Sequence, residues 1–281
     1  MTQASDWQGG VGRAWAEEWR RTDRTFAELT PQLLASTSQF AGRRILDLGC
    51  GAGEVALTLA ASRPDADVRG IDISEDLIRS ARDRRATDLP AHVSCRFELA
   101  DATVWADPDF APDLIVSRHG VMFFADPPAA FRHLALVSAP DARLVFSCFR
   151  AASENEWATA LATVVATEAA ANAAPSSSGF PPPGPFAFAD PANIHQALDG
   201  WTDITITPND FTYIAGEGED AEAQAEALFR RIGPAAAALR LADPADRPVV
   251  ERRLRDLISR HHHAGRVGFA AAAWIVTARR A

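Results

Sequence analysis

Short apolar runs recur along the first half of the chain at intervals of roughly 20 to 30 residues, the length of a strand followed by a helix. Between them, apolar residues return at helical spacing. This alternation predicts an α/β fold in which a mostly parallel sheet carries helices on both faces, the doubly wound arrangement. The third run alternates apolar and polar residues, which favours a strand near the sheet edge. The runs are Ile45–Leu48, Val68–Ile71, Val93–Leu99, Leu114–Val116 and Leu144–Phe149.

Capping signals indicate where two of the helices begin. Ser74 stands before Glu75 and Asp76, so a side-chain cap and two acids lie at the positive end of the helix dipole. Pro127 and Pro128 follow the fourth run, and proline is compatible with the first turn of a helix. We therefore expect helices that start at these two places.

The pattern changes after Arg150. An Ala-rich stretch typical of a helix leads into PSSSGFPPPGPFAFADP, which can be neither helix nor central strand. We then expect a strand interrupted at Pro208 and a helical stretch from Asp220 to His262. Breaks in that stretch are expected at Gly233–Pro234 and near Pro244. The segment VGFAAAAWIVTARR is predicted to close the chain as a strand.

The composition is that of an ordinary globular protein: 47% of the 281 residues are hydrophobic and 23% are charged. Acids outnumber bases 37 to 28, so affinity for a phosphate backbone is not expected. Neither a secretory signal nor a run of ~18 apolar residues is present, and we therefore expect a cytoplasmic protein with no membrane partner. Cys50, Cys95 and Cys148 are expected to be reduced, buried thiols.

The stretch ILDLGCGAGE suggests a ligand site. Gly49, Gly51 and Gly53 follow the first strand directly, which permits positive φ and lets a ligand approach the main chain. The next helix points its N-terminal amides into the same space. A dinucleotide fingerprint needs glycine where Glu54 stands, and an acid there would repel a pyrophosphate. The spacing therefore argues against a nicotinamide dehydrogenase.

Three acids follow or lie in successive strands. Asp47 is inside the first run, Asp72 ends the second and Asp101 ends the third. Since the carboxyl ends of parallel strands meet at one sheet edge, these carboxylates are expected near one crevice, where they would favour a ligand carrying an ammonium and a sulfonium. The acid after the second strand is where a ribose hydroxyl pair is held. The alternative for each acid is that it caps a helix or a turn.

These motifs resemble class I S-adenosylmethionine-dependent methyltransferases. ILDLGCGAGEVALTLA is similar to their first motif, VRGIDIS to their second and FELADATVW to their adenine-contact segment, and APDLIVSRHGVMFF through LVFSCFR matches their fourth and fifth strands. DWQGGVGRAW and GPFAFADP are similar to a bacterial small-molecule methyltransferase subgroup. The resemblance implies a Rossmann-like sheet of seven strands in the order 3-2-1-4-5-7-6, with strand 7 antiparallel.

The resemblance also implies a site for S-adenosyl-L-methionine, with S-adenosyl-L-homocysteine as the product. In that site Asp47 would contact the methionine end, Asp72 the ribose, and Asp101 the adenine amino edge beside Ala102. Ile73 would pack on the adenine. The full set of implied cofactor-binding residues is Trp7, Asp47, Gly49, Cys50, Gly51, Gly53, Asp72, Ile73, Asp101, Ala102 and Ser117.

His119 and Arg118 directly follow the fourth strand, beside the expected methyl site. Methyl transfer requires alignment of donor and acceptor and exclusion of water, and a hydroxyl acceptor usually also needs a base. We expect His119 to be either that base or a wall of the pocket, because imidazole titrates near ~6.5. Arg118 is expected either to anchor a substrate carboxylate or to pair with an internal acid or the cofactor carboxylate.

Other aromatic and histidine residues have two readings. Trp7 belongs either to a lid over the cofactor or to the core. The aromatic side chains that could roof an apolar acceptor pocket are Phe123, Phe124, Trp157, Phe186 and Phe188. His261–His263 are consecutive, so their side chains would point in different directions on a helix; we expect a solvated helix end and no metal site.

The sequence therefore predicts one domain over residues 1–281, in which 1–40 form an N-terminal helical lid, 41–150 the cofactor-binding core, and 151–200 and 216–265 insertions that cap the substrate. The predicted reaction is methyl transfer to a small, fairly apolar metabolite, with specialised metabolism as its setting.

Two alternatives remain at this stage. A methyltransferase acting on protein or nucleic acid would normally show a basic face or an N-P-P-[YF] segment. A non-catalytic scaffold usually loses the loop glycines or the ribose acid. The acceptor, the methylated atom and the oligomeric state, a homodimer included, stay open.

Overall fold

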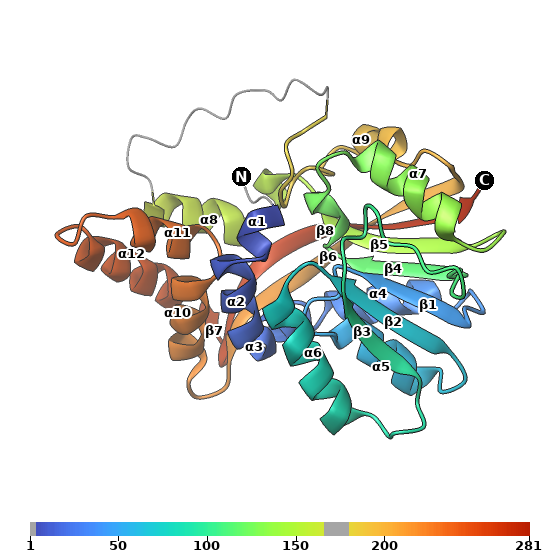
Figure 1. Cartoon of the computed structure of the whole chain (residues 1–281). Helices are drawn as coiled ribbons and strands as arrows, with labels where there is room; N and C mark the ends of the chain where they lie inside the picture. The colour runs from blue at the N-terminus through green and yellow to red at the C-terminus, as the bar shows by residue number, and fades with distance from the viewer. Residues whose placement is uncertain (1–3, 166–179) are drawn as a thin grey trace.

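The computed structural model describes residues 4–165 and 180–281. One sheet runs through these residues in the order β3-β2-β1-β4-β5-β8-β6, with the short β7 paired to β8 (Figure 1). β8 is antiparallel to both β5 and β6, and the other pairs along this path are parallel. The order implied by the resemblance is thus confirmed, with β8 in the place of the antiparallel strand 7. The strands are β1 (Arg44–Leu48), β2 (Asp67–Asp72), β3 (Cys95–Leu99), β4 (Leu114–Arg118), β5 (Arg143–Phe149), β6 (Trp201–Glu217), β7 (His262–His263) and β8 (Arg266–Arg280).

The apolar runs form strands because helices cover both sheet faces. Nearly every residue of β1, β2, β4 and β5 is buried, as a central parallel strand requires. α4 (Leu29–Thr37), α5 (Glu54–Ser62) and α6 (Glu75–Asp88) lie on one face, and α7 (Pro127–Val137) and α9 (Pro191–Ala197) lie on the other (Figure 1). β3 ends the strand order and alternates in burial, which confirms its predicted place at the edge.

The predicted helix starts are confirmed. The Ser74 hydroxyl accepts a hydrogen bond from the Leu77 amide at the start of α6. Pro127 is the first residue of α7, and Asp126 caps it by accepting from the Ala129 amide at 3.0 Å. The segment between β3 and β4 forms no helix.

Two expectations about the second half of the chain are wrong. β6 continues through Pro208, which pairs with Trp274, and its register shifts lie elsewhere. The proline is tolerated because β6 is the last strand of the sheet, so one of its edges meets no other strand. α12 (Arg247–Arg260) ends before the histidines, and His262–His263 form β7 rather than a solvated helix end.

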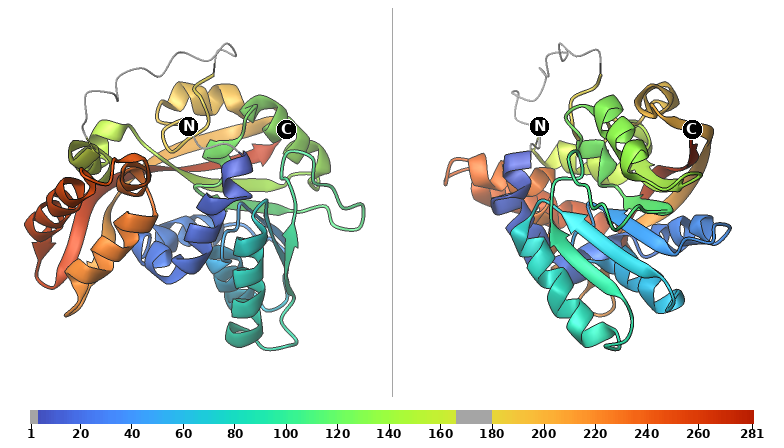
Figure 2. Two further views of the ribbon diagram at one scale, coloured as in Figure 1. Left: turned by 60° about the vertical axis from the view of Figure 1, so that its left-hand side comes forward. Right: turned by 45° about the vertical axis from the view of Figure 1, so that its right-hand side comes forward.

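The N-terminal helices and most helices of the insertions gather at one end of the sheet, whereas α9 lies beside α7 (Figure 2). α3 contacts both β6 and α10, and α8 contacts α11 and α12. The predicted break at Gly233–Pro234 is confirmed, since α11 begins at Pro234. The helices concerned are α1 (Ala4–Trp7), α2 (Gly10–Glu17), α3 (Trp19–Thr25), α8 (Glu156–Val165), α10 (Ala221–Arg231), α11 (Pro234–Leu241) and α12, and two 3-10 turns are η1 (Val121–Phe123) and η2 (Ala152–Glu154).

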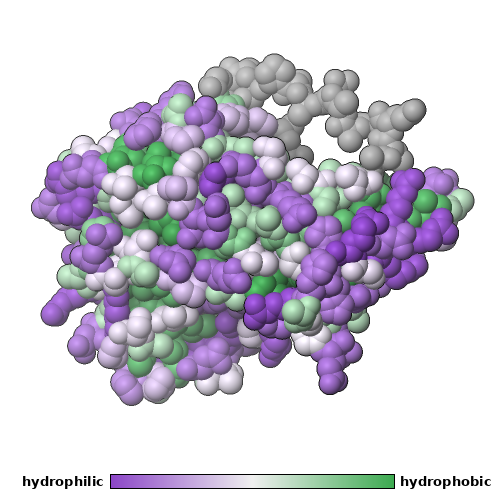
Figure 3. Space-filling view, turned by 180° about the vertical axis from the view of Figure 1, so that it is seen from behind, coloured by the Kyte–Doolittle hydropathy of each residue, from purple (hydrophilic) through white to green (hydrophobic). Residues whose placement is uncertain are grey.

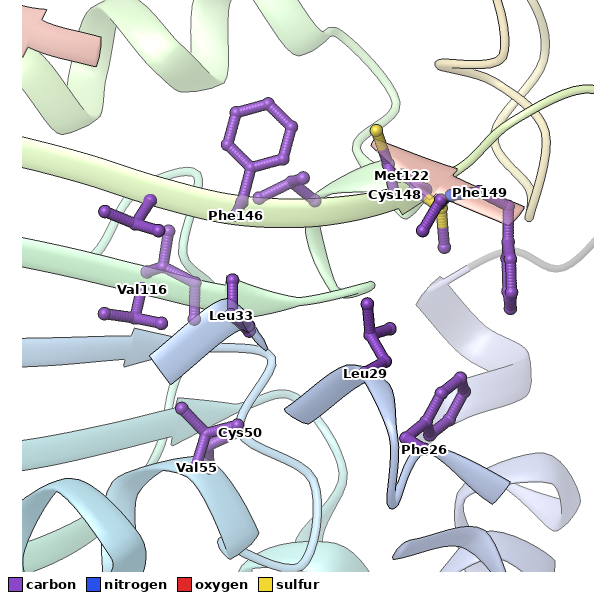
Figure 4. Close-up of a cluster of buried hydrophobic side chains, with 14 of the residues drawn as sticks. Phe26, Leu29, Leu33, Cys50, Val55, Val116, Met122, Phe146, Cys148 and Phe149 are labelled. Carbon is purple, nitrogen blue, oxygen red and sulfur yellow. Dashed lines mark hydrogen bonds between the residues drawn. The ribbon is translucent and has the colours of Figure 1, made fainter. Parts of the chain in front are cut away.

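The core fills the space between the sheet and its helices. Figure 4 shows Leu29 and Leu33 of α4 beneath Val116 of β4, with Phe146 of β5 on the opposite side of the sheet. All three cysteines are buried and none forms a disulfide. On the face in Figure 3, apolar residues lie in small separate areas among polar ones. No helix in residues 4–165 or 180–281 combines the length and apolarity needed to cross a membrane.

Candidate active site

A cavity of about 1420 Å³ lies where the carboxyl ends of the central strands face the N-terminal helices and the insertions. Two residues of the predicted site do not line it: Gly53 packs against the Phe97 ring, and the buried Ser117 hydroxyl donates to the Leu48 carbonyl at 2.8 Å. The predicted residues that do line it are Trp7, Asp47, Gly49, Cys50, Gly51, Asp72, Ile73, Asp101, Ala102, Arg118 and His119.

The glycines after β1 share a backbone conformation but differ in their surroundings. Gly49, Gly51 and Gly53 all have positive φ, at 60°, 54° and 90°, which disfavours residues with a side chain. A Cβ on Gly53 would lie 2.7 Å from the Phe97 ring, so this glycine serves packing. A Cβ on Gly51 would meet no protein atom within 4 Å, so this residue turns toward the cavity.

Asp72 ties the loop after β1 to the loop after β2. Its Oδ2 accepts from the Gly51 amide and its Oδ1 from the Ser74 amide, each at 2.9 Å. The carboxyl is buried, and burial raises its pKa while these hydrogen bonds oppose the shift. Each oxygen keeps further acceptor capacity for a ligand donor.

Asp47 and Asp101 lie in contrasting environments. Asp47 is fully buried within β1, where its Oδ2 accepts from the Ala56 amide at 3.1 Å. Burial raises the pKa of Asp47 to about 7, although the Arg118 charge opposes this. Asp101 is exposed, and its Oδ1 accepts from the Thr103 amide at 2.9 Å and the Thr103 hydroxyl at 2.7 Å. Asp101 therefore closes a turn, the alternative considered above, while it also lines the cavity.

The N-terminal helices are closely fitted against the side of the cavity that the loops after β1 and β2 line. Trp7 meets Trp15 and Phe123 edge to face, with ring centroids 5.4 and 5.1 Å apart. Its Nε1 has no hydrogen-bond partner in the described part of the chain. A Cβ on Gly12 would lie 2.0 Å from the Trp7 carbonyl and 2.3 Å from the Ser74 hydroxyl. α2 can approach the loop after Asp72 so closely only because residue 12 is glycine.

Arg118 is held by internal acids. Its guanidinium pairs with Glu54 and, at 3.3 Å, with Asp23, and it donates to the Thr30 hydroxyl at 2.8 Å. Asp23 also pairs with Arg84 at 2.9 Å. The internal-pair alternative is therefore the arrangement observed. Sequence reasoning missed both partners: Asp23 lies 95 residues away on α3, and Glu54 was read only as unfavourable for a pyrophosphate.

His119 lies in an aromatic enclosure. Its ring stacks on Phe149 with centroids 4.1 Å apart at 14°, and lies 5.0 Å from the tilted ring of Phe26. Figure 4 shows Phe26 and Phe149 projecting into the same space. Neither imidazole nitrogen has a hydrogen-bond partner among residues 4–165 and 180–281. Burial, followed by the charge of Arg118, lowers the pKa of His119 to about 3, so the ring is neutral at pH 7.

The cavity beyond His119 is walled by aromatic rings. Trp157 stacks on Tyr213 with centroids 5.4 Å apart at 21°, and lies nearly parallel to Phe186. Phe123 and Phe124 also line the cavity, whereas Phe188 is fully buried away from it. Tyr213 and Phe229 come from the second insertion and its flanking strand, and no sequence signal distinguished them from core residues.

The three adjacent histidines lie apart from this cavity. His261 stacks on Phe269, and its Nδ1 hydrogen-bonds the Leu257 carbonyl at 2.8 Å. His262 Nδ1 hydrogen-bonds Glu222 at 2.8 Å. Within the described ranges, no cluster of three or more side chains could hold a metal ion.

Known proteins share both the sequence pattern and the fold. A family described as a methyltransferase domain matches residues 18–177, more than half of the chain. The trans-aconitate 2-methyltransferase of Variovorax paradoxus is 35% identical over 135 residues, 48% of this chain and 47% of that protein. The 27-O-demethylrifamycin SV methyltransferase of Amycolatopsis mediterranei is 33% identical over 136 residues, 48% of this chain and 49% of that one. The matched region is thus about half the length of these curated relatives.

Among solved structures, phosphoethanolamine N-methyltransferase 2 of Haemonchus contortus, in complex with S-adenosylhomocysteine, shares the fold with a TM-score of 0.55. It is 14% identical, and the match covers 100% of this chain and 60% of that one. The sheet order, the glycine loop and the extent of the family match agree. The chain therefore belongs to the class I S-adenosylmethionine-dependent methyltransferase family.

Proposed function

We propose that this protein transfers a methyl group from S-adenosyl-L-methionine to a small, fairly apolar molecule and releases S-adenosyl-L-homocysteine. One observation carries the proposal: a single cavity joins the acid-lined glycine loop to an aromatic enclosure. Its volume, about 1420 Å³, exceeds the ~300–1,000 Å³ of a usual ligand pocket and is sufficient for two ligands side by side.

The acid-lined half suits the cofactor. We assign Asp72 to the ribose hydroxyls, because its carboxylate is fixed by two amides and keeps acceptor capacity. Gly51 would allow close approach of the ligand to the main chain, since its missing Cβ faces open space. Asp47 would favour the cationic methionine end. Asp101 and Ala102 would contact the adenine, with Ile73 beside them.

The bound cofactor supplies a methyl group on a positively charged sulfur. The protein's own contribution is to align the acceptor and to exclude water. The N-terminal helices, with Trp7 against Phe123, are suited to the second task, and we assign residues 1–40 the role of a lid. The insertions that carry Trp157 and Tyr213 are suited to the first.

A small acceptor is favoured over a macromolecule because aromatic side chains from both insertions enclose the far half of the cavity. The two curated relatives are likewise named for small acceptors, trans-aconitate and a rifamycin. An acceptor from specialised metabolism and a cytoplasmic location belong to the same proposal; three buried thiols without a disulfide are typical of that compartment. The scaffold alternative is disfavoured because the loop glycines and Asp72 are retained.

Calorimetric titration tests the proposal directly. We expect saturable binding of S-adenosyl-L-homocysteine and S-adenosyl-L-methionine and none of NADH. Binding of NADH without the nucleoside thioethers would overturn it. Tight cofactor binding without methylation of any small molecule, in a screen that reads release of S-adenosyl-L-homocysteine, would favour the scaffold instead.

A further inference from the structure

Resting on this proposed function, we propose that the methyl acceptor is a neutral, planar aromatic alcohol whose hydroxyl hydrogen-bonds the edge of the His119 ring. The chemical class is that of a phenol or naphthol. Three independent features of the cavity point to it: the ion pairs between its arginines and acids, the aromatic walls, and the imidazole nitrogens of His119 that have no hydrogen-bond partner among the described residues.

The arginines that line the described cavity are unsuited to a polyanionic acceptor. Arg118 pairs with Asp23 and Glu54, and Arg231 pairs with Glu17 and, at 3.3 Å, with Glu18. A di- or tricarboxylate would have to displace an acid from one of these pairs.

Arg240 is the third arginine on this lining, and it is exposed. It could therefore reach only a ligand group close to solvent. The chain contains no lysine, and its segment 166–179 contains no arginine. Among the described lining residues, no buried arginine is therefore left unpaired to hold a carboxylate in the aromatic half in place of water.

The walls favour a flat apolar molecule. The Phe149, Trp157 and Tyr213 rings line the same half of the cavity, and the Trp157 and Phe186 planes lie within 24° of each other. The Tyr213 hydroxyl is already hydrogen-bonded to the Thr25 side chain. Ring faces and edges with no free charge bind another aromatic system by stacking and burial.

His119 supplies the polar contact that these walls lack. Phe149 and Phe26 contact its ring, and both nitrogens remain without a partner within residues 4–165 and 180–281. Phenylalanine would fill this space equally well, without leaving two buried polar atoms unpaired. His119 also has φ of 61°, a conformation that costs energy for a residue with a side chain and is concentrated at functional sites.

A neutral imidazole offers one donor and one acceptor, and a hydroxyl is a group that can use either. This matches an alcohol better than a carboxylate, which only accepts, or an ammonium, which only donates. The ring edge would hold the hydroxyl oxygen in line with the methyl group, so His119 both orients the acceptor and receives its proton.

In the transfer step, a lone pair of the hydroxyl oxygen forms the new O–CH₃ bond, and the electron pair of the breaking C–S bond returns to sulfur. The hydroxyl proton moves to the imidazole nitrogen and is lost to water when the methyl ether leaves. Because burial lowers the pKa of His119 to about 3, the ring does not ionise the alcohol beforehand. It takes the proton late, when the oxygen has become strongly acidic through bonding to carbon.

The test compares 1-naphthol with naphthalene as ligands for the protein saturated with S-adenosyl-L-homocysteine, by calorimetry. Three proteins are compared: wild type, His119→Phe and His119→Asn. Phenylalanine keeps the ring packing and removes both nitrogens, whereas asparagine tolerates positive φ and keeps a donor and an acceptor. Citrate serves as the polycarboxylate probe.

We expect wild type to bind 1-naphthol at least tenfold more tightly than naphthalene, and citrate not at all. In His119→Phe this ratio should fall to near one, and His119→Asn should recover part of it. With S-adenosyl-L-methionine present, wild type should form 1-methoxynaphthalene, and His119→Phe should form it at least tenfold more slowly.

Three outcomes would overturn the inference: an unchanged hydroxyl preference in His119→Phe, tighter binding of citrate than of 1-naphthol, or no binding of 1-naphthol. Each can occur while S-adenosyl-L-homocysteine still binds, so methyl transfer would stand with another acceptor. Failure of S-adenosyl-L-homocysteine to bind would instead overturn the proposed function. Wild-type affinity for S-adenosyl-L-homocysteine shows that a variant is folded. If either His119→Phe or His119→Asn loses that affinity, the comparison with wild type uses the other variant alone.

Discussion

The two halves of the cavity differ in the chemistry of their walls. At the ends of β1, β2 and β3, carboxylates and main-chain amides surround a glycine turn; we propose that this half, the cofactor half, selects charge and hydrogen-bonding pattern. Beyond His119, in the acceptor half, the walls are aromatic rings, and Arg118 and Arg231 are paired with acids; we propose that this half selects shape and one hydroxyl. The cofactor and the acceptor would therefore bind to separate sets of residues, so the residues around the acceptor could change without affecting those around the cofactor.

The largest effect is expected from His119 in the acceptor half. It concerns how the free energy of unfolding changes with pH. The folded state keeps His119 neutral down to a pKa of about 3, while the unfolded chain protonates it below ~6.5. The unfolded state therefore binds more protons in this window, and the free energy of unfolding falls as pH decreases. The slope contributed by this one group is about 1.4 kcal/mol per pH unit.

His119→Phe should remove this contribution. Between pH 6 and pH 4, wild type should lose about 3 kcal/mol more stability than the variant, as measured by urea unfolding at each pH. His92→Gln, at an exposed histidine, controls for the loss of an imidazole. Parallel profiles for wild type and His119→Phe would mean that the ring is already charged or solvated in the folded state. The aromatic half of the cavity would then not be an uncharged region, and it would no longer differ in this respect from the acid-lined half.

The next effect concerns the cofactor half and separates two of its acids. Asp72→Ala removes a buried carboxylate that holds two loops, so affinity for S-adenosyl-L-homocysteine should fall by about 1 to 3 kcal/mol. Asp101→Ala should cost less, because this acid is exposed and its hydrogen bonds close its own turn. Calorimetry on both variants gives the comparison. An equal loss of affinity in the two variants, or a larger loss in Asp101→Ala, would mean that Asp72 does not bind the ribose.

The acids and glycines of the cofactor half are the part of the site that could be predicted from the sequence. Parallel strands follow each other with helices between them, so the positions of Asp47, Asp72 and Asp101 after regular intervals translate directly into one sheet edge. The same regularity gave the strands, because buried parallel strands are continuous apolar runs. The places of β6 and β8 in the sheet needed the family resemblance, since three helices, α10 to α12, separate these two strands along the chain instead of a simple crossover.

The acceptor half depends on contacts between segments far apart in the chain. Nothing local to Arg118 indicates that Asp23 would reach it from α3, and nothing local to Tyr213 separates a cavity residue from a core residue. Pro208 was misread for a related reason. Proline interrupts a central strand, but whether a strand is central or last in the sheet is decided by tertiary order.

A smaller effect tests how the N-terminal helices meet the cofactor half. A methyl group at position 12 would overlap the Trp7 carbonyl and the Ser74 hydroxyl, so Gly12→Ala should loosen the packing of α1 and α2. The expected cost is about 1 kcal/mol, the low end for overpacking, because a terminal helix can shift away. Hydrogen exchange of residues 4–17 should then quicken about fivefold, with the exchange of β1 and β4 unchanged.

Gly10→Ala is the matched control in the same helix, since a Cβ there meets no protein atom within 4 Å. Alanine is also the better helix former, so this variant should exchange no faster than wild type. Equal acceleration in both variants would mean that the close fit at Gly12 does not hold α1 and α2 in place in solution.

The smallest effect reports the charge of the cofactor itself. Burial sets the pKa of Asp47 at about 7, so at pH 7 the group is roughly half protonated without ligand. A sulfonium nearby would favour the carboxylate and lower that pKa, releasing up to about half a proton. The uncharged thioether of S-adenosyl-L-homocysteine should release less. Binding enthalpies measured in phosphate and in Tris give the number of protons released by each ligand.

The difference between the two ligands is the informative quantity, because their amino and carboxylate groups are the same and cancel. In Asp47→Asn the difference should vanish, and in wild type it should shrink above pH 8, where Asp47 is already ionised. Asp72 also has a raised pKa, so a difference that survives in Asp47→Asn but disappears in Asp72→Asn would assign the sulfonium to the second strand. In that case Asp47 would have a structural role, through the hydrogen bond that it accepts from the Ala56 amide. Asp72, at the end of β2, would be the acid that recognises the sulfonium.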